Sequence, residues 1–233
     1  MDVKIKKRLV AGLVAGFLLW GPVFCFAGSE TIQDFRLWTP VYVNFPISGP
    51  VKGYMEANPR FSDDASQINQ LLLRPAVGYQ LTPTISLWQG YGWVANYQPS
   101  YTQEHRIFQQ LIYTNKFSTF TLFSRSRLEE RWIQHAIGTA VRARTMLRGT
   151  FPLPASPALA IAVYDEIFVN LNTIRLGPEA GFEQNRFFLG LNYTFSPNLN
   201  VDAGYQLQII NTPLSGTVNQ ANHILLLQFF INL

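Results

Sequence analysis

The end of the chain is the feature that most limits the fold. Residues 223–233, HILLLQFFINL, alternate between two faces, and one face is apolar from Leu225 onwards. That face consists of Leu225, Leu227, Phe229, Ile231 and Leu233. A strand of about ten residues with one apolar face is typical of a transmembrane β-barrel. A sheet edge cannot stay unpaired in lipid, so such a strand must close on the first strand. We therefore predict an all-β barrel, with Leu227, Phe229, Ile231 and Leu233 as its assembly signal.

The beginning of the chain predicts export. Four basic residues lie between Lys4 and Arg8, an apolar segment follows, and Gly21-Pro22 ends it. Cys25-Phe26-Ala27 then offers a signal-peptidase site with small residues at its two key positions. We expect residues 1–27 to be a signal peptide and residues 28–233 to be one barrel domain. The alternative is an uncleaved helical anchor over residues 9–26, which has about the length that a bilayer requires.

The net charge of +4 does not indicate a nucleic-acid partner. Four of the 18 basic residues and one of the 14 acidic residues lie within residues 1–27, so the remainder carries 14 bases and 13 acids. The one cysteine of the chain, Cys25, also lies in this segment. We therefore expect neither a disulfide nor thiol chemistry in the exported protein.

The rest of the chain divides into alternating runs separated by turn residues. We expect strands near residues 34–45, 51–61, 68–81, 85–97, 104–114, 117–132, 137–148, 158–169, 183–195, 199–210 and 222–233. Short and longer connections alternate, as in an up-and-down antiparallel barrel with short periplasmic turns and long outer loops. Bacterial barrels of this kind have an even number of strands. A break near Pro40 would make twelve from these eleven runs, which we favour, whereas leaving one run out would make ten.

The polar face of the strands carries a cluster of charges. If each apolar face meets lipid, the inner face holds Arg60, Arg74, Glu104, Arg106, Arg125, Arg127, Glu129, Arg131, Arg142, Arg144, Glu166, Arg186 and Asp202, together with Glu56 and Arg148. Ten of these are arginines and five are acids. The cluster is either a network of ion pairs that braces the barrel or the lining of a small pore that prefers anions. Asp165 is an acid that this assignment leaves facing outward.

A partial internal repeat relates two hairpins. Residues 79–91 and 193–205 share the pattern Tyr-x-apolar-Thr/Ser-Pro, and Gly-Tyr begins seven residues after the proline in both. The tyrosines fall on the apolar face, where they would suit the aromatic girdles of a membrane barrel. Shared turn chemistry explains such a repeat without a common function.

Nothing in the sequence forms a recognisable catalytic motif. The histidines His105, His135 and His223 fall near the expected outer rim, which makes them weak candidates for the base of a lipid hydrolase. Serine and acid companions would be Ser100, Ser124, Ser126, Glu104 and Glu130, but Gly-x-Ser-x-Gly is absent. No metal motif and no phosphate-binding glycine loop occurs, so we expect neither a metal nor a cofactor.

Several spaced motifs resemble the bacterial family known as domain of unknown function 2490. They are Trp38, Asn58-x-Arg60-Phe61, Leu72-Leu73-Arg74-Pro75-x-x-Gly78-Tyr79, Gly90-Tyr91, Glu104-His105-Arg106-x-Phe108-Gln109-Gln110, Arg125-x-Arg127-x-Glu129-x-Arg131 and Gln184-Asn185-Arg186-x-Phe188-x-Gly190. The resemblance implies an outer-membrane barrel with a charged lumen. It implies no reaction.

Three functions remain open at this point. The first is an outer-membrane barrel of a Gram-negative bacterium whose arginine-rich interior is structural or forms a small anion-preferring pore. The second is an outer-leaflet lipid or lipopolysaccharide hydrolase with a rim histidine, and the third is a surface binding or adhesion barrel. In each case the expected partners are outer-membrane lipid, lipopolysaccharide and the barrel assembly machinery, with no nucleic acid.

Overall fold

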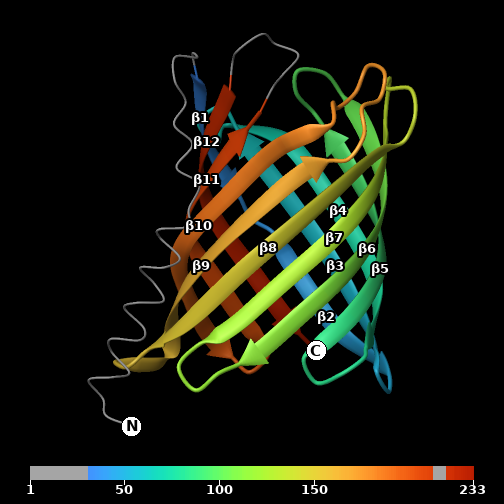
Figure 1. Ribbon diagram of the computed structural model, residues 1–233. Helices are drawn as coiled ribbons and strands as arrows, with labels where there is room; N and C mark the ends of the chain where they lie inside the picture. Colours follow the sequence, from blue (N-terminus) through green and yellow to red (C-terminus); the bar gives the residue numbers. More distant parts are fainter. Residues whose placement is uncertain (1–30, 212–218) are drawn as a thin grey trace.

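The computed structural model describes residues 31–211 and 219–233 and shows a closed β-barrel (Figure 1). Its strands are β1 (Thr31–Trp38), β2 (Val41–Ser48), β3 (Val51–Ser62), β4 (Gln67–Gln80), β5 (Ile85–Asn96), β6 (Thr102–Lys116), β7 (Thr121–Ile133), β8 (Ala140–Leu153), β9 (Ser156–Asn170), β10 (Gly181–Ser196), β11 (Leu199–Ile210) and β12 (Asn219–Asn232). The all-β barrel is confirmed, and the described residues form twelve strand segments. The predicted signal peptide lies outside the described residues.

The break that we expected near Pro40 exists, but the two pieces do not form a hairpin. β1 and β2 both run parallel to β12 in one register, with Trp38 opposite Leu226 and Val41 opposite Phe229. Both pieces also pair with β3 in one antiparallel register. They therefore occupy a single position, and eleven positions complete the wall. Each neighbouring pair from β2 to β12 is antiparallel, and the closing pair is parallel.

Proline explains why the first strand is interrupted without leaving the wall. Pro40 has no N–H to donate to a neighbouring strand. Its carbonyl still accepts the Phe229 N–H at 2.9 Å, and the Thr39 N–H donates to the Pro59 carbonyl at 3.2 Å. Thr39 is thus hydrogen-bonded to β3, and Pro40 is hydrogen-bonded to β12. An odd number of positions places the start of β1 at the long-loop end. We had expected both ends of the barrel to lie on the short-turn, periplasmic side.

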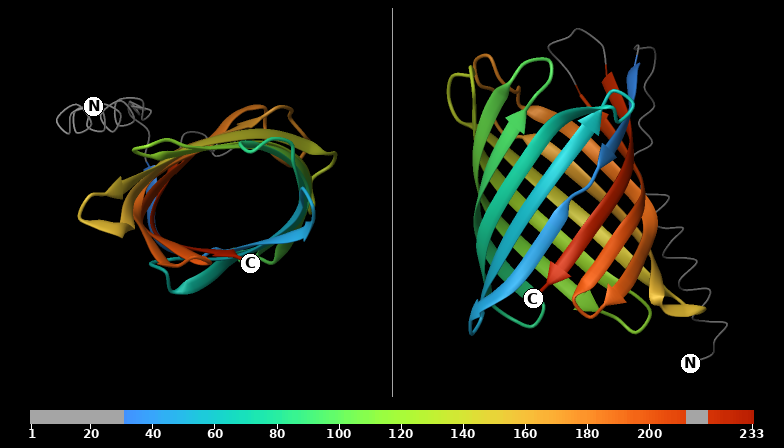
Figure 2. Two further views of the ribbon diagram at one scale, coloured as in Figure 1. Left: turned by 90° about the horizontal axis from the view of Figure 1, so that it is seen from below. Right: turned by 180° about the vertical axis from the view of Figure 1, so that it is seen from behind.

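The two ends of the barrel differ as predicted. The connections on the side of the C-terminus have two to four residues, whereas those on the opposite side have four to ten. Figure 2 shows the short turns and the C-terminus at one end and the longer loops at the other. The lower half of the barrel is hereafter the half towards the short turns, and the upper half is the half towards the long loops. The connection between β8 and β9 is a two-residue turn rather than the nine-residue segment we expected.

The strands alternate in burial along most of their length. On β4, the outward Leu73, Val77 and Tyr79 are 38%, 53% and 51% exposed, while the inward Leu72 and Arg74 are 1% and 4% exposed. The outer surface therefore presents a band of apolar side chains, as a membrane-type barrel requires. Within the described residues, no helix has the length and apolar character needed to cross a membrane.

Candidate functional site: the charged lumen

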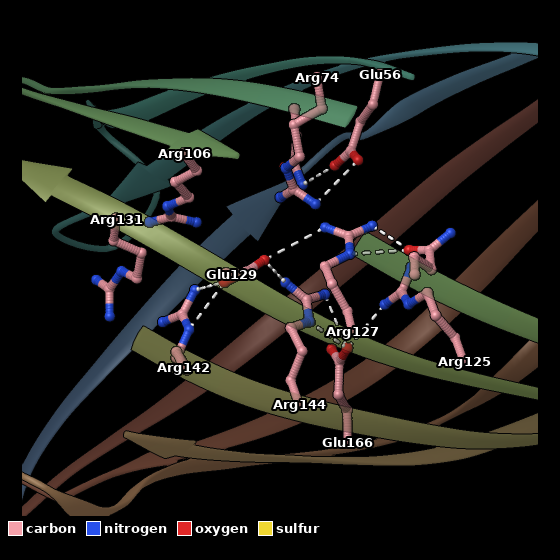
Figure 3. Close-up of polar contacts among 12 residues, drawn as sticks. Glu56, Arg74, Arg106, Arg125, Arg127, Glu129, Arg131, Arg142, Arg144 and Glu166 are labelled. Carbon is pink, nitrogen blue, oxygen red and sulfur yellow. Dashed lines mark hydrogen bonds and ion pairs between the residues drawn. The ribbon is translucent and has the colours of Figure 1, made fainter. Parts of the chain in front are cut away.

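The structure places the predicted charge cluster on the inner face of the barrel. Thirteen of its fifteen members are at most 8% exposed, and Arg125 and Arg148 are partly buried. Alternation explains this placement, since every other residue of β3 to β11 points inward. The cluster includes most of the residues drawn in Figure 3, which shows them reaching towards one another across the lumen.

Glu129 on β7 is the centre of the network. Its Oε1 lies 3.4 Å from Nη1 of Arg127 and 3.3 Å from Nη1 of Arg144, and its Oε2 accepts from Arg142. The carboxylate is 1% exposed. An unpaired charge at such a position would be very costly, so the three guanidinium groups are what permit Glu129 to be ionised there.

Glu166 on β9 extends the network towards the other side of the barrel. Its Oε1 lies 2.8 Å from both Arg125 and Arg144, and its Oε2 lies 4.0 Å from Arg186. Arg125 comes from β7 and reaches across β8 to make this contact. Arg144 contacts both Glu129 and Glu166 and so joins the two parts of the network.

Glu183 completes the upper end of the network, and the sequence analysis missed it. It lies 3.0 Å from Arg131 and 2.6 Å from Arg142, and Arg131 also lies 2.6 Å from Glu104. Strict alternation from Arg186 would turn Glu183 outward. A register shift between Phe182 and Gln184 turns it inward instead. Such a β-bulge re-aims a side chain, and alternation in the sequence does not reveal it.

The lower half of the lumen holds two separate ion pairs. Glu56 lies 3.0 Å from Arg74 and accepts a 2.6 Å hydrogen bond from the hydroxyl of Tyr54. Asp202, which is fully buried, lies 2.8 Å from Arg148. Charge pairing thus continues below the main network, but as isolated contacts.

Aromatic rings compensate for the excess of arginine over acid. The Arg60 guanidinium lies 3.8 Å from the centre of the Trp38 ring, and that of Arg127 lies 4.0 Å from the Phe108 ring. Phe168 faces three arginines, with Arg186 at 4.5 Å. A cation over a desolvated aromatic face gains about 2 kcal/mol. These rings are inward and buried, so the inner face is aromatic as well as charged.

One sector of the inner wall is apolar. Trp38, Ala162, Tyr164, Phe188, Ile224 and Leu226 form a buried cluster on β1, β9, β10 and β12. Tyr164 and Phe188 stack with ring centres 4.8 Å apart. The inner wall therefore combines a charged network with an apolar cluster, and β9 and β10 contribute to both, a division that alternation does not predict.

A cavity of about 400 Å³ occupies the lower half of the lumen. Its upper boundary includes Arg127, Arg144 and Glu166 of the network, and its lower part includes Thr114 and Asn200. Thr114 is exposed and Asn200 is partly exposed, so solvent reaches the cavity from the short-turn end. Volumes of a few hundred Å³ are typical of small-molecule sites.

The three histidines do not assemble a catalytic group. His105 and His223 lie on the outer face, where their Nδ1 atoms are 2.5 Å and 2.7 Å from the hydroxyls of Tyr91 and Tyr205. Tyr91 and Tyr205 are equivalent residues of the internal repeat, and each histidine lies on the strand that follows its tyrosine, β6 or β12. His135 lies in an exposed turn with a φ of 70°. Among the described residues, no serine or carboxylate is hydrogen-bonded to a histidine, and no group of three metal-ligating side chains occurs.

Asp165 remains on the outer face, where the sequence placed it. It is in regular register with Leu147 and Phe187, so no bulge turns it inward. Its two carboxylate oxygens accept 2.9 Å and 3.1 Å hydrogen bonds from Nδ2 of Asn185. This pairing offsets the cost of placing a charge on an otherwise apolar surface.

Taken together, the closed sheet, apolar outer band and charge-paired interior define a membrane-type β-barrel. The chain belongs to the DUF2490 family, proteins of unknown function, whose family model matches residues 35–219. An uncharacterized protein of Methylorubrum extorquens is 34% identical over 209 residues, which cover 88% of this chain and 90% of that protein.

Two solved structures are also similar to the chain. Outer-membrane expressed OmpT of Vibrio cholerae has a TM-score of 0.40 at 11% identity, covering 76% of this chain and 61% of that one. The siderophore receptor PirA of Pseudomonas aeruginosa has a TM-score of 0.31 at 11% identity, covering 78% and 38%. The chain thus spans less than two thirds of the length of either.

Proposed function

We propose that the protein is an outer-membrane β-barrel of a Gram-negative bacterium in which the arginine–glutamate network closes the lumen. One observation carries this proposal. Ion pairs run without interruption from Arg106 through Glu104, Arg131, Glu183, Arg142, Glu129 and Arg144 to Glu166. These side chains come from β6, β7, β8, β9 and β10, and all are at least 84% buried.

The network acts as a brace rather than as the lining of an open pore. A pore that selects anions needs arginines whose guanidinium groups face water in the path of the ion. Here the arginines of the upper half donate to carboxylates or lie over aromatic rings. Bidentate and shared contacts of this kind fix side chains in place and join strands that are not neighbours.

Two measurements test this proposal. Membrane fractionation should recover the protein in the outer membrane with heat-modifiable gel mobility. In a planar bilayer, the wild-type protein should give no steady conductance. Arg142→Ala, which removes contacts to Glu129 and Glu183, should produce openings. Under a salt gradient their reversal potential should indicate anion preference, because the remaining arginines stay protonated. Steady current through the wild-type barrel would overturn the proposal.

A further inference from the structure

The cavity in the lower half contains buried hydrogen-bond donors that the protein leaves unused. Five N–H-bearing atoms that line it have no hydrogen-bond partner among the described residues: Trp38 Nε1, Arg74 Nε, Arg125 Nε, Gln206 Nε2 and Gln228 Nε2. Trp38, Arg74, Gln206 and Gln228 are each at most 6% exposed. Buried donors are normally paired, so their concentration in one cavity indicates a complementary acceptor.

The charge of the cavity wall indicates that this acceptor is an anion. Among the described residues, seven arginines and two glutamates line the cavity. Both glutamates are already occupied, Glu56 by Arg74 and Tyr54 and Glu166 by Arg125 and Arg144. Arginine remains protonated, so the excess of positive charge persists at any working pH. Planar guanidinium groups match the geometry of a carboxylate.

The remaining lining indicates the shape of the molecule that carries the carboxylate. Tyr42 stacks on Phe230 with ring centres 5.0 Å apart and on Tyr54 at 6.3 Å. Trp88 meets the edge of Tyr54 at 6.2 Å. Phe123 also lines the cavity. These aromatic faces favour a flat aromatic body, because offset stacking and edge-to-face contacts add to the gain from burial.

We propose that the cavity binds a small aromatic carboxylate that enters from the short-turn end. Its carboxylate accepts from the unused donors beneath the network, and its ring lies among Tyr42, Tyr54 and Phe230. Entry is from below because the lower lining is exposed at Thr114, whereas Glu129, Arg127 and Arg144 fill the upper side. The cavity is therefore a closed binding pocket and not a passage.

The ligand class is tested by calorimetric titration of the full chain, refolded in a nonionic detergent. Benzoate is the probe. Benzyl alcohol, which lacks the negative charge, and acetate, which lacks the aromatic ring, are the two control ligands. We expect saturable binding of benzoate at one site and binding at least about tenfold weaker for the other two, since a hydrogen-bonded charge is worth about that factor. Equal binding of acetate would show a simple anion site, and equal binding of decanoate would show an acyl-chain site. Either result, or no benzoate binding, would overturn the proposal.

Three variants locate the site. Gln228→Leu removes one unused donor and should weaken benzoate binding about tenfold. Thr114→Trp places a large side chain in the exposed part of the lining and should abolish binding. Asn115→Trp is the matched control, because this neighbouring position points to the outer face and should leave binding unchanged. Heat-modifiable mobility verifies that each variant is folded. Unchanged affinity in both Gln228→Leu and Thr114→Trp would place the benzoate elsewhere and overturn the proposal.

Discussion

The two halves of the lumen use the same strand alternation and the same excess of arginine, yet they differ in what fills them. In the upper half, carboxylates and aromatic rings meet the arginines, and Glu129 is 1% exposed. In the lower half, ion pairs are isolated, and a cavity of about 400 Å³ remains. An inward arginine therefore braces the barrel where carboxylates and aromatic rings surround it, and lines a pocket where they do not.

The length of the inward side chains explains the difference. In the lower half, short residues line the lumen, namely Thr114, Thr121, Thr150, Asn192 and Asn200. In the upper half, many inward positions carry arginine, glutamate, glutamine or phenylalanine, which reach across the bore beside shorter residues such as Ala140 and Asn222. A barrel of about eleven positions is narrow enough for long side chains to fill and wide enough for short ones to leave a space.

The largest effect is expected where the lower half of the wall closes. Residues 229–232 pair with β2 through residues 41–44, and they are the contacts that close the sheet in this half. Deleting Phe229–Leu233 leaves that edge unpaired in lipid, which a membrane barrel does not tolerate. We expect the truncated chain to be degraded before assembly. Normal outer-membrane levels of the truncated protein would show that the upper half closes and holds the barrel by itself.

The next largest effect is expected at the centre of the upper network. Glu129→Gln leaves Arg127, Arg142 and Arg144 without their shared carboxylate. Breaking a buried ion pair on one side costs about 3–5 kcal/mol. Thermal unfolding in detergent measures this loss. The control is Glu179→Gln, which changes an exposed loop carboxylate and should alter the free energy of unfolding by less than about 0.5 kcal/mol. Equal midpoints for the two variants would mean that the upper half is hydrated.

Replacing single arginines distinguishes the brace from the surface. Arg127→Leu and Arg144→Leu each remove a cation from Glu129, and Arg144→Leu also affects Glu166. Both should be destabilised by several kcal/mol. Arg175→Leu, in an exposed loop, should change stability by less than about 1 kcal/mol. Three equal unfolding midpoints would contradict the role of the network as a brace.

The smallest effect is expected among the short residues of the lower half. Thr121→Ala removes a partly exposed hydroxyl from the cavity wall and should change the free energy of unfolding by less than about 0.5 kcal/mol. The same unfolding measurement in detergent tests this. Destabilisation as large as that of Glu129→Gln would show that the lower half is packed as tightly as the upper one.

The fold could be predicted from the sequence because alternation with period two is a local signal. It placed the apolar face of β12, and together with the turn residues it placed the short and long connections. The break near Pro40 was instead expected from the even number of strands that such barrels have. The direction of closure could not be predicted in this way. Whether two pieces separated by Thr39-Pro40 form a hairpin or continue in line depends on their pairing with β3 and β12, which are distant in sequence.

The members of the charge cluster could also be predicted locally, since each of these arginines and acids follows the alternation of its own strand. The groups that pair with the arginines could not all be predicted in this way. Glu183 became inward through a bulge, and Phe168 is an apolar residue that the sequence analysis did not place inside. The cavity was missed for the same reason, because the space left by Thr121 and Asn200 depends on what stands opposite them across the barrel.

The accessibility of single cysteines along the lumen tests the central claim most directly. The described residues contain no cysteine, since Cys25 is the only one in the chain. Thr121→Cys and Thr150→Cys lie in the lower half, whereas Ala140→Cys and Asn222→Cys replace inward residues of the upper half that are 1% and 0% exposed. A charged, membrane-impermeant thiol reagent should label the first two rapidly and the last two hardly at all. Equal labelling rates at all four positions would show an open, water-filled lumen and contradict the account.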